Sequence, residues 1–144
     1  MRVLVLNGPN LNLLGERETG IYGSETLDRV NDRIRTRADE LGIEVAFEQS
    51  NHEGTLIDLI QEHREWDAMI LNAAGYTHTS VALADAIAGV ALPTVEVHIS
   101  DVYAREPFRH HSYIEAVAML TIVGHGTDGY IEALEAIQER LGSG

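Results

Sequence analysis

The sequence contains neither cysteine nor lysine. Without cysteine, the chain can form no disulfide, no thiolate nucleophile and no cysteine-based zinc site. Without lysine, no lysine Schiff base can form with a carbonyl substrate. All ten basic residues are arginines. We favour genomic composition bias as the origin of that pattern, and the chemical exclusions hold whatever its origin.

Positive charge is scarce as well. Ten basic residues stand against 23 acidic ones, which gives a formal net charge of −13. Nucleic-acid binding needs a basic surface, so we expect no nucleic-acid partner. Because the overall field repels anions, an anionic small molecule would have to be held locally by arginines and backbone N–H groups.

Long apolar runs are absent too. No segment approaches the roughly 20 apolar residues that a membrane-spanning helix needs. The apolar start over residues 1–6 is too short for the core of a signal peptide, and it breaks at Asn7, Gly8 and Pro9. We therefore expect a cytoplasmic protein that does not contact membranes, and the length predicts one domain over residues 1–144.

The chain shows an alternation of strand and helix patterns. Short apolar segments predict five strands, at residues 3–6, 44–47, 68–71, 94–97 and 120–123. Apolar residues at helical spacing predict four helices, over residues 27–41, 56–63, 81–87 and 127–141. Thr26 and Ser80 are expected to cap the first and third helices, and Gly42 and Gly89 to end them.

This alternation predicts an α/β protein with a doubly wound parallel sheet. At this size we expect a flavodoxin-like fold with strand order 2-1-3-4-5. Ligands of such sheets bind beyond the carboxyl ends of the strands, where the strand order reverses. The predicted strand ends are followed by polar residues, at 7–10, 72, 98–100 and 124–125.

A histidine stands at one of these strand exits. Because side chains alternate along a strand, Glu96 and His98 lie on the same side. A carboxylate beside an imidazole fixes its tautomer and favours its protonated form, which suits a general acid. The structural alternative is a capped or core histidine at a strand end.

A tyrosine and an arginine share the glycine-bounded loop after the first strand. At pH 7 a free phenolate lies roughly 4 kcal/mol uphill, because the pKa of tyrosine is about 10. A neighbouring guanidinium, here Arg17, can supply part of that energy and let Tyr22 act as a base. The alternative is a loop tyrosine that packs its ring beside a solvated arginine.

Two further loops are candidates for substrate binding. The small residues of segment 72–80 let a ligand approach the backbone, and the start of the next helix offers N–H groups to an anion; an ordinary strand–helix connection is the alternative. Arg105 and Arg109 could bind hydroxyls or carboxylates from one rim, or form surface ion pairs. His110 and His111 match no metal motif, so we predict no metal site.

Segment 124–129 reads Gly-His-Gly-Thr-Asp-Gly, a literal GxGxxG between a strand and a helix. A dinucleotide site would need a following strand and an acidic residue about 20 positions on. The sequence has neither, so we expect these glycines to allow a tight turn and close helix packing. No phosphate-binding P-loop motif occurs, and we predict no cofactor.

Five segments together resemble type II 3-dehydroquinate dehydratase, in the family's order and spacing and over essentially the whole chain: 7–17 with Tyr22 and Gly23, 49–54, 72–80, 96–100 and 104–113. The resemblance implies a flavodoxin-like hydro-lyase of the shikimate pathway that converts 3-dehydroquinate to 3-dehydroshikimate without a cofactor. The unrelated type I enzymes use a lysine Schiff base, so a chain without lysine fits only the type II route through an enolate.

The resemblance also implies roles for individual residues in the reaction. Tyr22 matches the base that removes the proton beside the ketone, and Arg17 matches the lid residue that favours the phenolate. His98 matches the acid that protonates the departing hydroxyl, steadied by Glu96. Asn10 matches the residue that helps to hold the enolate through a water.

The implied substrate contacts involve a second set of residues. Asn72 and the backbone of Ile99 and Ser100 would take the substrate carboxylate, and His78 and Arg109 would bind the ring hydroxyls. Asp85 matches an acidic residue that reaches into the site of a neighbouring subunit. The family forms trimers assembled into dodecamers, so a homododecamer is expected here.

One departure from the family pattern is visible. Where the family usually has proline after Arg-Glu, this chain has Thr19 and Gly20, which should make the lid more flexible. Three other interpretations stay open from the sequence: a non-catalytic binding module, another cofactor-free enzyme acting on a hydroxy-keto acid, and a flavin-binding protein. A quinate-degrading role in place of a biosynthetic one is open as well.

Overall fold

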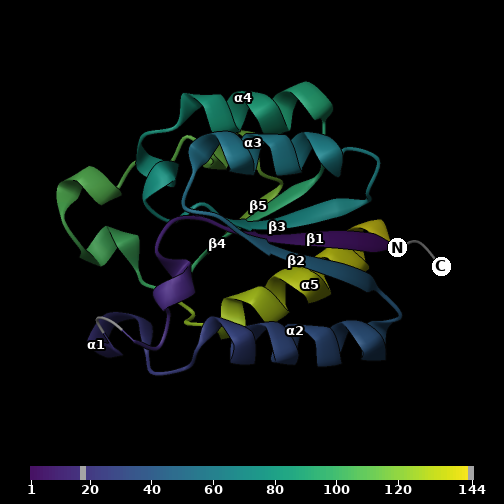
Figure 1. Cartoon of the computed structure of the whole chain (residues 1–144), viewed down its shortest axis with the longest axis horizontal. Coiled ribbons are helices and arrows are strands. Elements are labelled where there is room, and N and C mark those ends of the chain that lie inside the picture. Colours follow the sequence, from purple (N-terminus) through teal and green to yellow (C-terminus); the bar gives the residue numbers. More distant parts are fainter. Residues whose placement is uncertain (17–18, 143–144) are drawn as a thin grey trace.

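The computed structural model describes residues 1–16 and 19–142 and has three layers (Figure 1). The central layer is a five-stranded parallel sheet in the order β2-β1-β3-β4-β5. Its strands are β1 (Arg2–Asn7), β2 (Glu44–Gln49), β3 (Ala68–Asn72), β4 (Thr94–His98) and β5 (Leu120–Val123). The predicted flavodoxin-like order is therefore confirmed.

Helices cover both faces of the sheet. Helices α3 (Glu53–Glu62) and α4 (Val81–Val90) pack side by side on one face, and α2 (Leu27–Leu41) and α5 (Asp128–Leu141) pack on the other (Figure 1). Of the helices in the described residues, none is long and apolar enough to cross a membrane.

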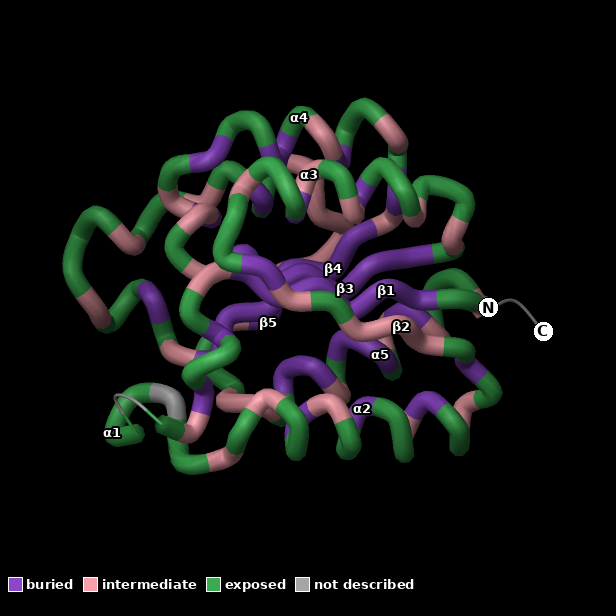
Figure 2. Tube along the Cα trace, in the orientation of Figure 1, coloured by how far each residue is buried: buried purple, intermediate pink, exposed green. Residues whose placement is uncertain are grey.

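The first strand shows how the sequence builds two cores. Its side chains alternate between the faces of the sheet, so Val3 and Val5 pack toward α2 and α5, whereas Leu4 and Leu6 pack toward α3 and α4. All four side chains are fully buried. A strand buried on both faces needs a continuous apolar run, and Figure 2 shows the sheet as the buried centre of the molecule.

Helix ends follow the sequence signals in most places. The Thr26 hydroxyl accepts from the Arg29 N–H, and the Ser80 hydroxyl accepts from the Leu83 N–H, so both predicted caps are confirmed. Gly42 ends α2 in the left-handed conformation. The prediction that Gly89 ends α4 is wrong: the helix continues to Val90, which packs against the core, and Ala91 takes the left-handed position with φ 55°.

The glycines of segment 124–129 serve the turn and the packing that their spacing predicts. Gly124 and Gly126 adopt positive φ values of 78° and 61° between β5 and α5. A Cβ on Gly129 would lie 3.2 Å from a methyl group of Val97, so the start of α5 packs closely on β4. Close packing of helix on sheet at this point brings the next residue, Tyr130, beneath the strand ends.

The loops at the carboxyl ends of the strands gather at one edge of the sheet (Figure 1). They contain short helices that the sequence patterns did not predict: α1 (Thr19–Tyr22) and the 3-10 helices η1 (Leu11–Leu13), η2 (Ala74–His78), η3 (Val102–Ala104), η4 (Pro107–Arg109) and η5 (Glu115–Val117). This edge holds the candidate site.

Candidate active site

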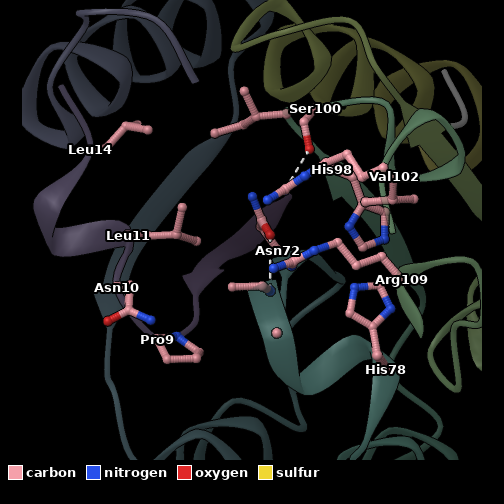
Figure 3. A pocket seen from close by; sticks show the side chains of 14 residues that line it. Pro9, Asn10, Leu11, Leu14, Asn72, His78, His98, Ser100, Val102 and Arg109 are labelled. Carbon is pink, nitrogen blue, oxygen red and sulfur yellow. Dashed lines mark hydrogen bonds between the residues drawn. The ribbon is translucent and has the colours of Figure 1, made fainter. Parts of the chain in front are cut away.

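A cavity of about 210 Å³ opens at the carboxyl ends of β1, β3 and β4 (Figure 3). Its walls come from four loops: the one after β1, η2, the one after β4, and η3 with η4. The lining residues are Pro9, Asn10, Leu11, Leu14, Asn72, Ala74, Gly75, His78, His98, Ile99, Ser100, Val102, Arg105 and Arg109. The strand-order reversal therefore coincides with the cavity, as expected for this fold.

The last residues of β4 form a buried acid–imidazole pair. The Nε2 of His98 lies 2.5 Å from Oε2 of Glu96. Glu96 is completely buried and His98 is 5% exposed. Because the carboxylate binds Nε2, the opposite ring nitrogen, Nδ1, is the one left for the cavity that His98 lines. The predicted Glu96–His98 contact is therefore present.

Three hydroxyl groups complete the surroundings of the Glu96 carboxylate. Thr77 and Ser112 donate to Oε2 at 2.9 and 2.5 Å, and Thr121 donates to Oε1 at 3.0 Å. Burial alone would raise the pKa of Glu96, but the hydrogen bonds from His98, Ser112 and Thr77 hold it below its ordinary value. The carboxylate therefore stays ionised beside the imidazole.

A second histidine stacks near His98 at the cavity wall. The rings of His78 and His98 have centroids 6.5 Å apart and planes inclined by only 17°. The Nδ1 of His78 is 2.8 Å from the backbone oxygen of His111, which fixes the ring orientation. Partial burial lowers the pKa of His78, and the charges of His98 and Arg109 act in the same direction. A neutral His78 suits a hydrogen-bonding role toward a substrate.

Asn72, at the end of β3, is held by a buried hydrogen-bond chain. Its Oδ1 accepts from the Ala74 N–H at 3.0 Å, and its Nδ2 donates to the hydroxyl of Tyr130 at 2.9 Å. The Tyr130 hydroxyl in turn donates to Oδ1 of Asn7 at 2.6 Å. Asn72 is 4% exposed, and the little surface that it keeps lines the cavity.

Two arginines also line the cavity. The Arg105 guanidinium donates to the Ser100 hydroxyl at 3.2 Å (Figure 3). Arg109 donates through Nε to Glu106 at 2.7 Å, which leaves the outer part of its guanidinium toward the cavity that it lines. Both arginines therefore bring positive charge to the cavity of an otherwise acidic protein.

Asn10 lies across the cavity, just after β1. Its backbone has φ 70°, a left-handed conformation that asparagine tolerates better than most residues. Its N–H donates to Oδ1 of Asn51 at 2.9 Å, which anchors this turn to the loop after β2. Segment 49–54, one of the five matching segments, thus supports the wall on which Asn10 sits.

The cavity gathers seven of the predicted site residues and leaves others outside it. Asn10, Asn72, His78, His98, Ile99, Ser100 and Arg109 line it, and Glu96 lies directly behind His98. Asp85 is exposed on α4 and does not line the cavity. Arg17 and the side chain of Tyr22 fall outside the described residues; the backbone of Tyr22 ends α1. Gly124 and His125, which also follow a strand, are not part of the lining.

Sequence reasoning missed the residues that support the site from behind. Thr77, Ser112 and Thr121 surround Glu96, and Tyr130 holds Asn72. Only Tyr130 carries a usable signal, because a tyrosine on the buried face of an amphipathic helix needs a hydrogen-bond partner for its hydroxyl.

No group of three or more histidine, aspartate or glutamate side chains that could hold a metal ion occurs within residues 1–16 and 19–142. The chemistry that this arrangement offers is proton transfer and anion binding by side chains. An imidazole backed by a carboxylate can move a proton, and Asn72 with the rim arginines can bind a negative group.

Comparison with known proteins identifies the family to which this chain belongs. Residues 1–138 match the family model described as Dehydroquinase class II. The chain belongs to the class II dehydroquinase family. It is 54% identical over 140 residues to the 3-dehydroquinate dehydratase of Trichodesmium erythraeum, covering 96% of this chain and 93% of that protein. It is 56% identical over 134 residues to the enzyme of Bordetella avium, covering 92% and 93%.

The fold agrees with solved members of the family. The crystal structure of type II dehydroquinase from Butyrivibrio crossotus superimposes with a TM-score of 0.94 at 46% identity, covering 96% of this chain and 97% of that one. The predicted resemblance to type II 3-dehydroquinate dehydratase is therefore confirmed. Its members are hydro-lyases that function in the shikimate pathway, and this chain is an enzyme of that kind.

Proposed function

We propose that this protein dehydrates 3-dehydroquinate to 3-dehydroshikimate through an enolate, with His98 as general acid and Tyr22 as base. The observation that carries the proposal is the ionised, fully buried Glu96 bound to Nε2 of His98 at the wall of the cavity. Elimination of water beside a ketone needs a base, an enolate stabiliser and an acid, and all three kinds of group occur among the matching residues.

In the first step a base removes a proton from the carbon beside the ketone. We assign this role to Tyr22, with Arg17 favouring its phenolate form by charge. The electron pair released from the C–H bond moves onto the carbonyl oxygen and gives an enolate. Asn10, which lines the cavity on the β1 side, would stabilise that oxygen through a bound water.

In the second step the enolate collapses and the C–O bond at the neighbouring carbon breaks. His98 gives the departing hydroxyl a proton from Nδ1, so the group leaves as water. Its Nε2–H remains bound to Glu96 throughout. The carboxylate stabilises the imidazolium before transfer and keeps the ring oriented after it.

The substrate contacts follow the same match between sequence and cavity. The free N–H of Asn72, with the backbone N–H groups of Ile99 and Ser100, would bind the substrate carboxylate. His78 and Arg109 would bind the ring hydroxyls on the opposite side. Support comes from the position of all five residues on the walls of one cavity.

We further propose a single catalytic domain that assembles as a homododecamer of four trimers in the cytoplasm. Asp85 is exposed on α4 and does not line its own chain's cavity, which is consistent with a role in the site of a neighbouring subunit. Sedimentation equilibrium would test the assembly, since a monomer would leave Asp85 without that role.

The division of labour between base and acid can be tested by hydrogen exchange in D₂O. The variant His98→Ala should incorporate deuterium into 3-dehydroquinate beside the ketone, because enolate formation does not need the acid, while product formation falls at least 100-fold. Tyr22→Phe should neither incorporate deuterium nor form product. His125→Ala, which alters an exposed histidine outside the cavity, is the control and should behave as wild type. Wild-type turnover in His98→Ala would refute the assignment.

A further inference from the structure

A buried hydrogen-bond network lies beneath the cavity, and one of its members, Asn72, is the proposed ligand of the substrate carboxylate. Its other two members, Tyr130 and Asn7, have no role of their own in the proposed reaction. The hydroxyl of Tyr130, from α5, sits between Asn7 at the end of β1 and Asn72 at the end of β3. These two asparagines are register partners in the sheet. Tyr130 is fully buried, and Asn7 and Asn72 are 2% and 4% exposed.

The donor and acceptor of each of the three hydrogen bonds in this network can be assigned. The backbone N–H of Ala74 can only donate, so the atom of Asn72 that it contacts at 3.0 Å must be the oxygen. The other end of that carboxamide is therefore Nδ2, and it donates to the Tyr130 hydroxyl. Since the hydroxyl accepts there, its own proton goes to Oδ1 of Asn7.

This arrangement leaves one N–H of Asn72 uncommitted among the contacts of the described residues. The Nδ2 group has two hydrogens, and Tyr130 takes one. Asn72 lines the cavity, so the second hydrogen is available to a ligand there (Figure 3). A carboxamide fixed at both ends offers that hydrogen in one orientation, without loss of side-chain freedom when a ligand binds.

A phenylalanine would fill the same space in α5 without needing a partner. Burial raises the pKa of Tyr130 above its ordinary value of 10, so the phenol keeps its proton and its donor role toward Asn7. The buried hydroxyl therefore needs hydrogen-bond partners, here Asn7 and Asn72, whereas a phenylalanine at this position would need none. Of these three residues, Asn72 is the one that lines the cavity, so any effect of the network on the site passes through Asn72.

We infer that Tyr130 is a positioning residue: held by Asn7, its hydroxyl orients the carboxamide of Asn72 so that one N–H binds the anionic group of the substrate. The inference rests on the proposed role of Asn72 as a ligand of the substrate carboxylate. Tyr130 itself does not line the cavity, so it acts only through Asn72.

The test compares Tyr130→Phe with Ile137→Val, a matched change at a fully buried residue of the same helix. Tyr130→Phe should raise KM for 3-dehydroquinate about tenfold, the effect of one lost hydrogen bond, and change kcat less than threefold. Ile137→Val should leave KM unchanged. Equal KM values in wild type and Tyr130→Phe would overturn the inference, as would equal KM increases in Tyr130→Phe and Ile137→Val.

A variant cycle separates positioning from general damage. In an Asn72→Ala background, the added Tyr130→Phe change should have no further effect on KM, because the residue through which it acts is gone. An undiminished effect in that background contradicts the inference. If Tyr130→Phe fails to fold, Asn7→Ala takes its place, and it should also raise KM because the hydroxyl loses the acceptor that orients it.

A structural readout keeps the inference separate from the proposed reaction. Crystal structures should show the Asn72 carboxamide in one orientation in wild type and Ile137→Val, and displaced or in two orientations in Tyr130→Phe. An unchanged Asn72 in Tyr130→Phe would overturn the inference whatever the enzyme does. Absence of turnover by wild type would instead overturn the proposed function.

Discussion

Thr121 provides the sharpest test of how the buried Glu96 carboxylate is stabilised. It faces Glu96 across the β4–β5 ladder, and its hydroxyl donates to Oε1 at 3.0 Å. Among the described residues, it is the one donor to that oxygen. Thr121→Val keeps the shape of the side chain and removes the donor, so the variant leaves no cavity but orphans one oxygen of a fully buried charge.

The expected loss follows from the energy of a hydrogen bond to a charged group. Such a bond contributes about 2 kcal/mol, so the free energy of unfolding at pH 7 should fall by about 2 kcal/mol. Thr55→Val, at an exposed position of α3, is the control and should change it by less than about 0.5 kcal/mol. Urea titrations at one fixed protomer concentration measure both.

The pH dependence of this loss identifies Glu96 as its source. The pKa of Glu96 is lowered in the folded protein, despite burial, by hydrogen bonds that favour the ionised form. A lowered folded-state pKa gives stabilisation that is complete above the unfolded value, near 4.5, and is lost as the pH falls through the lower folded value. The Thr121→Val penalty should therefore shrink below pH 4.5. A penalty that is absent at pH 7, or equal at all pH values, would refute the reasoning.

Three further substitutions test the turn after β1, helix α4 and the proposed role of Arg17. A Cβ on Gly8 would lie 2.6 Å from the Ala73 carbonyl oxygen, so Gly8→Ala should cost about 2 kcal/mol of unfolding free energy by overpacking. Gly89→Ala, at an open helical position, should stabilise by about 0.5–1 kcal/mol; equal effects in urea titration would contradict this account. Arg17→Ala should remove about 3 kcal/mol of transition-state stabilisation, measured as a fall in kcat/KM. Its circular dichroism spectrum should be unchanged. Near-normal kinetics would refute the role of Arg17.

The sheet could be predicted from the sequence because its signals are local. β1 and β3 contain short apolar runs, and two caps, Thr26 and Ser80, lie directly before their helices. The false end at Gly89 shows the limit of such signals. Glycine weakens a helix by only about 1 kcal/mol, and packing of Val90 against the core extends α4 past it.

The contact between Glu96 and His98 could be predicted for the same reason. The residues that support the site from behind could not. Glu96 and His98 are two residues apart, so strand periodicity alone places them together. The Tyr130 hydroxyl instead joins residues 58 and 123 positions away. Hydroxyl residues such as Thr77 and Ser112 are common at surfaces and caps, and nothing in their local pattern indicates that they converge on one buried carboxylate.

The central claim is that this chain dehydrates 3-dehydroquinate with Tyr22 as the base. The most direct measurement follows the ultraviolet absorbance of the conjugated enone product for wild type, Tyr22→Phe and Tyr103→Phe, the last at an exposed tyrosine outside the cavity. The account predicts turnover in wild type and Tyr103→Phe, and a loss of at least about 1000-fold in Tyr22→Phe, about 4 kcal/mol. No turnover by folded wild type, or undiminished turnover in Tyr22→Phe, would contradict it.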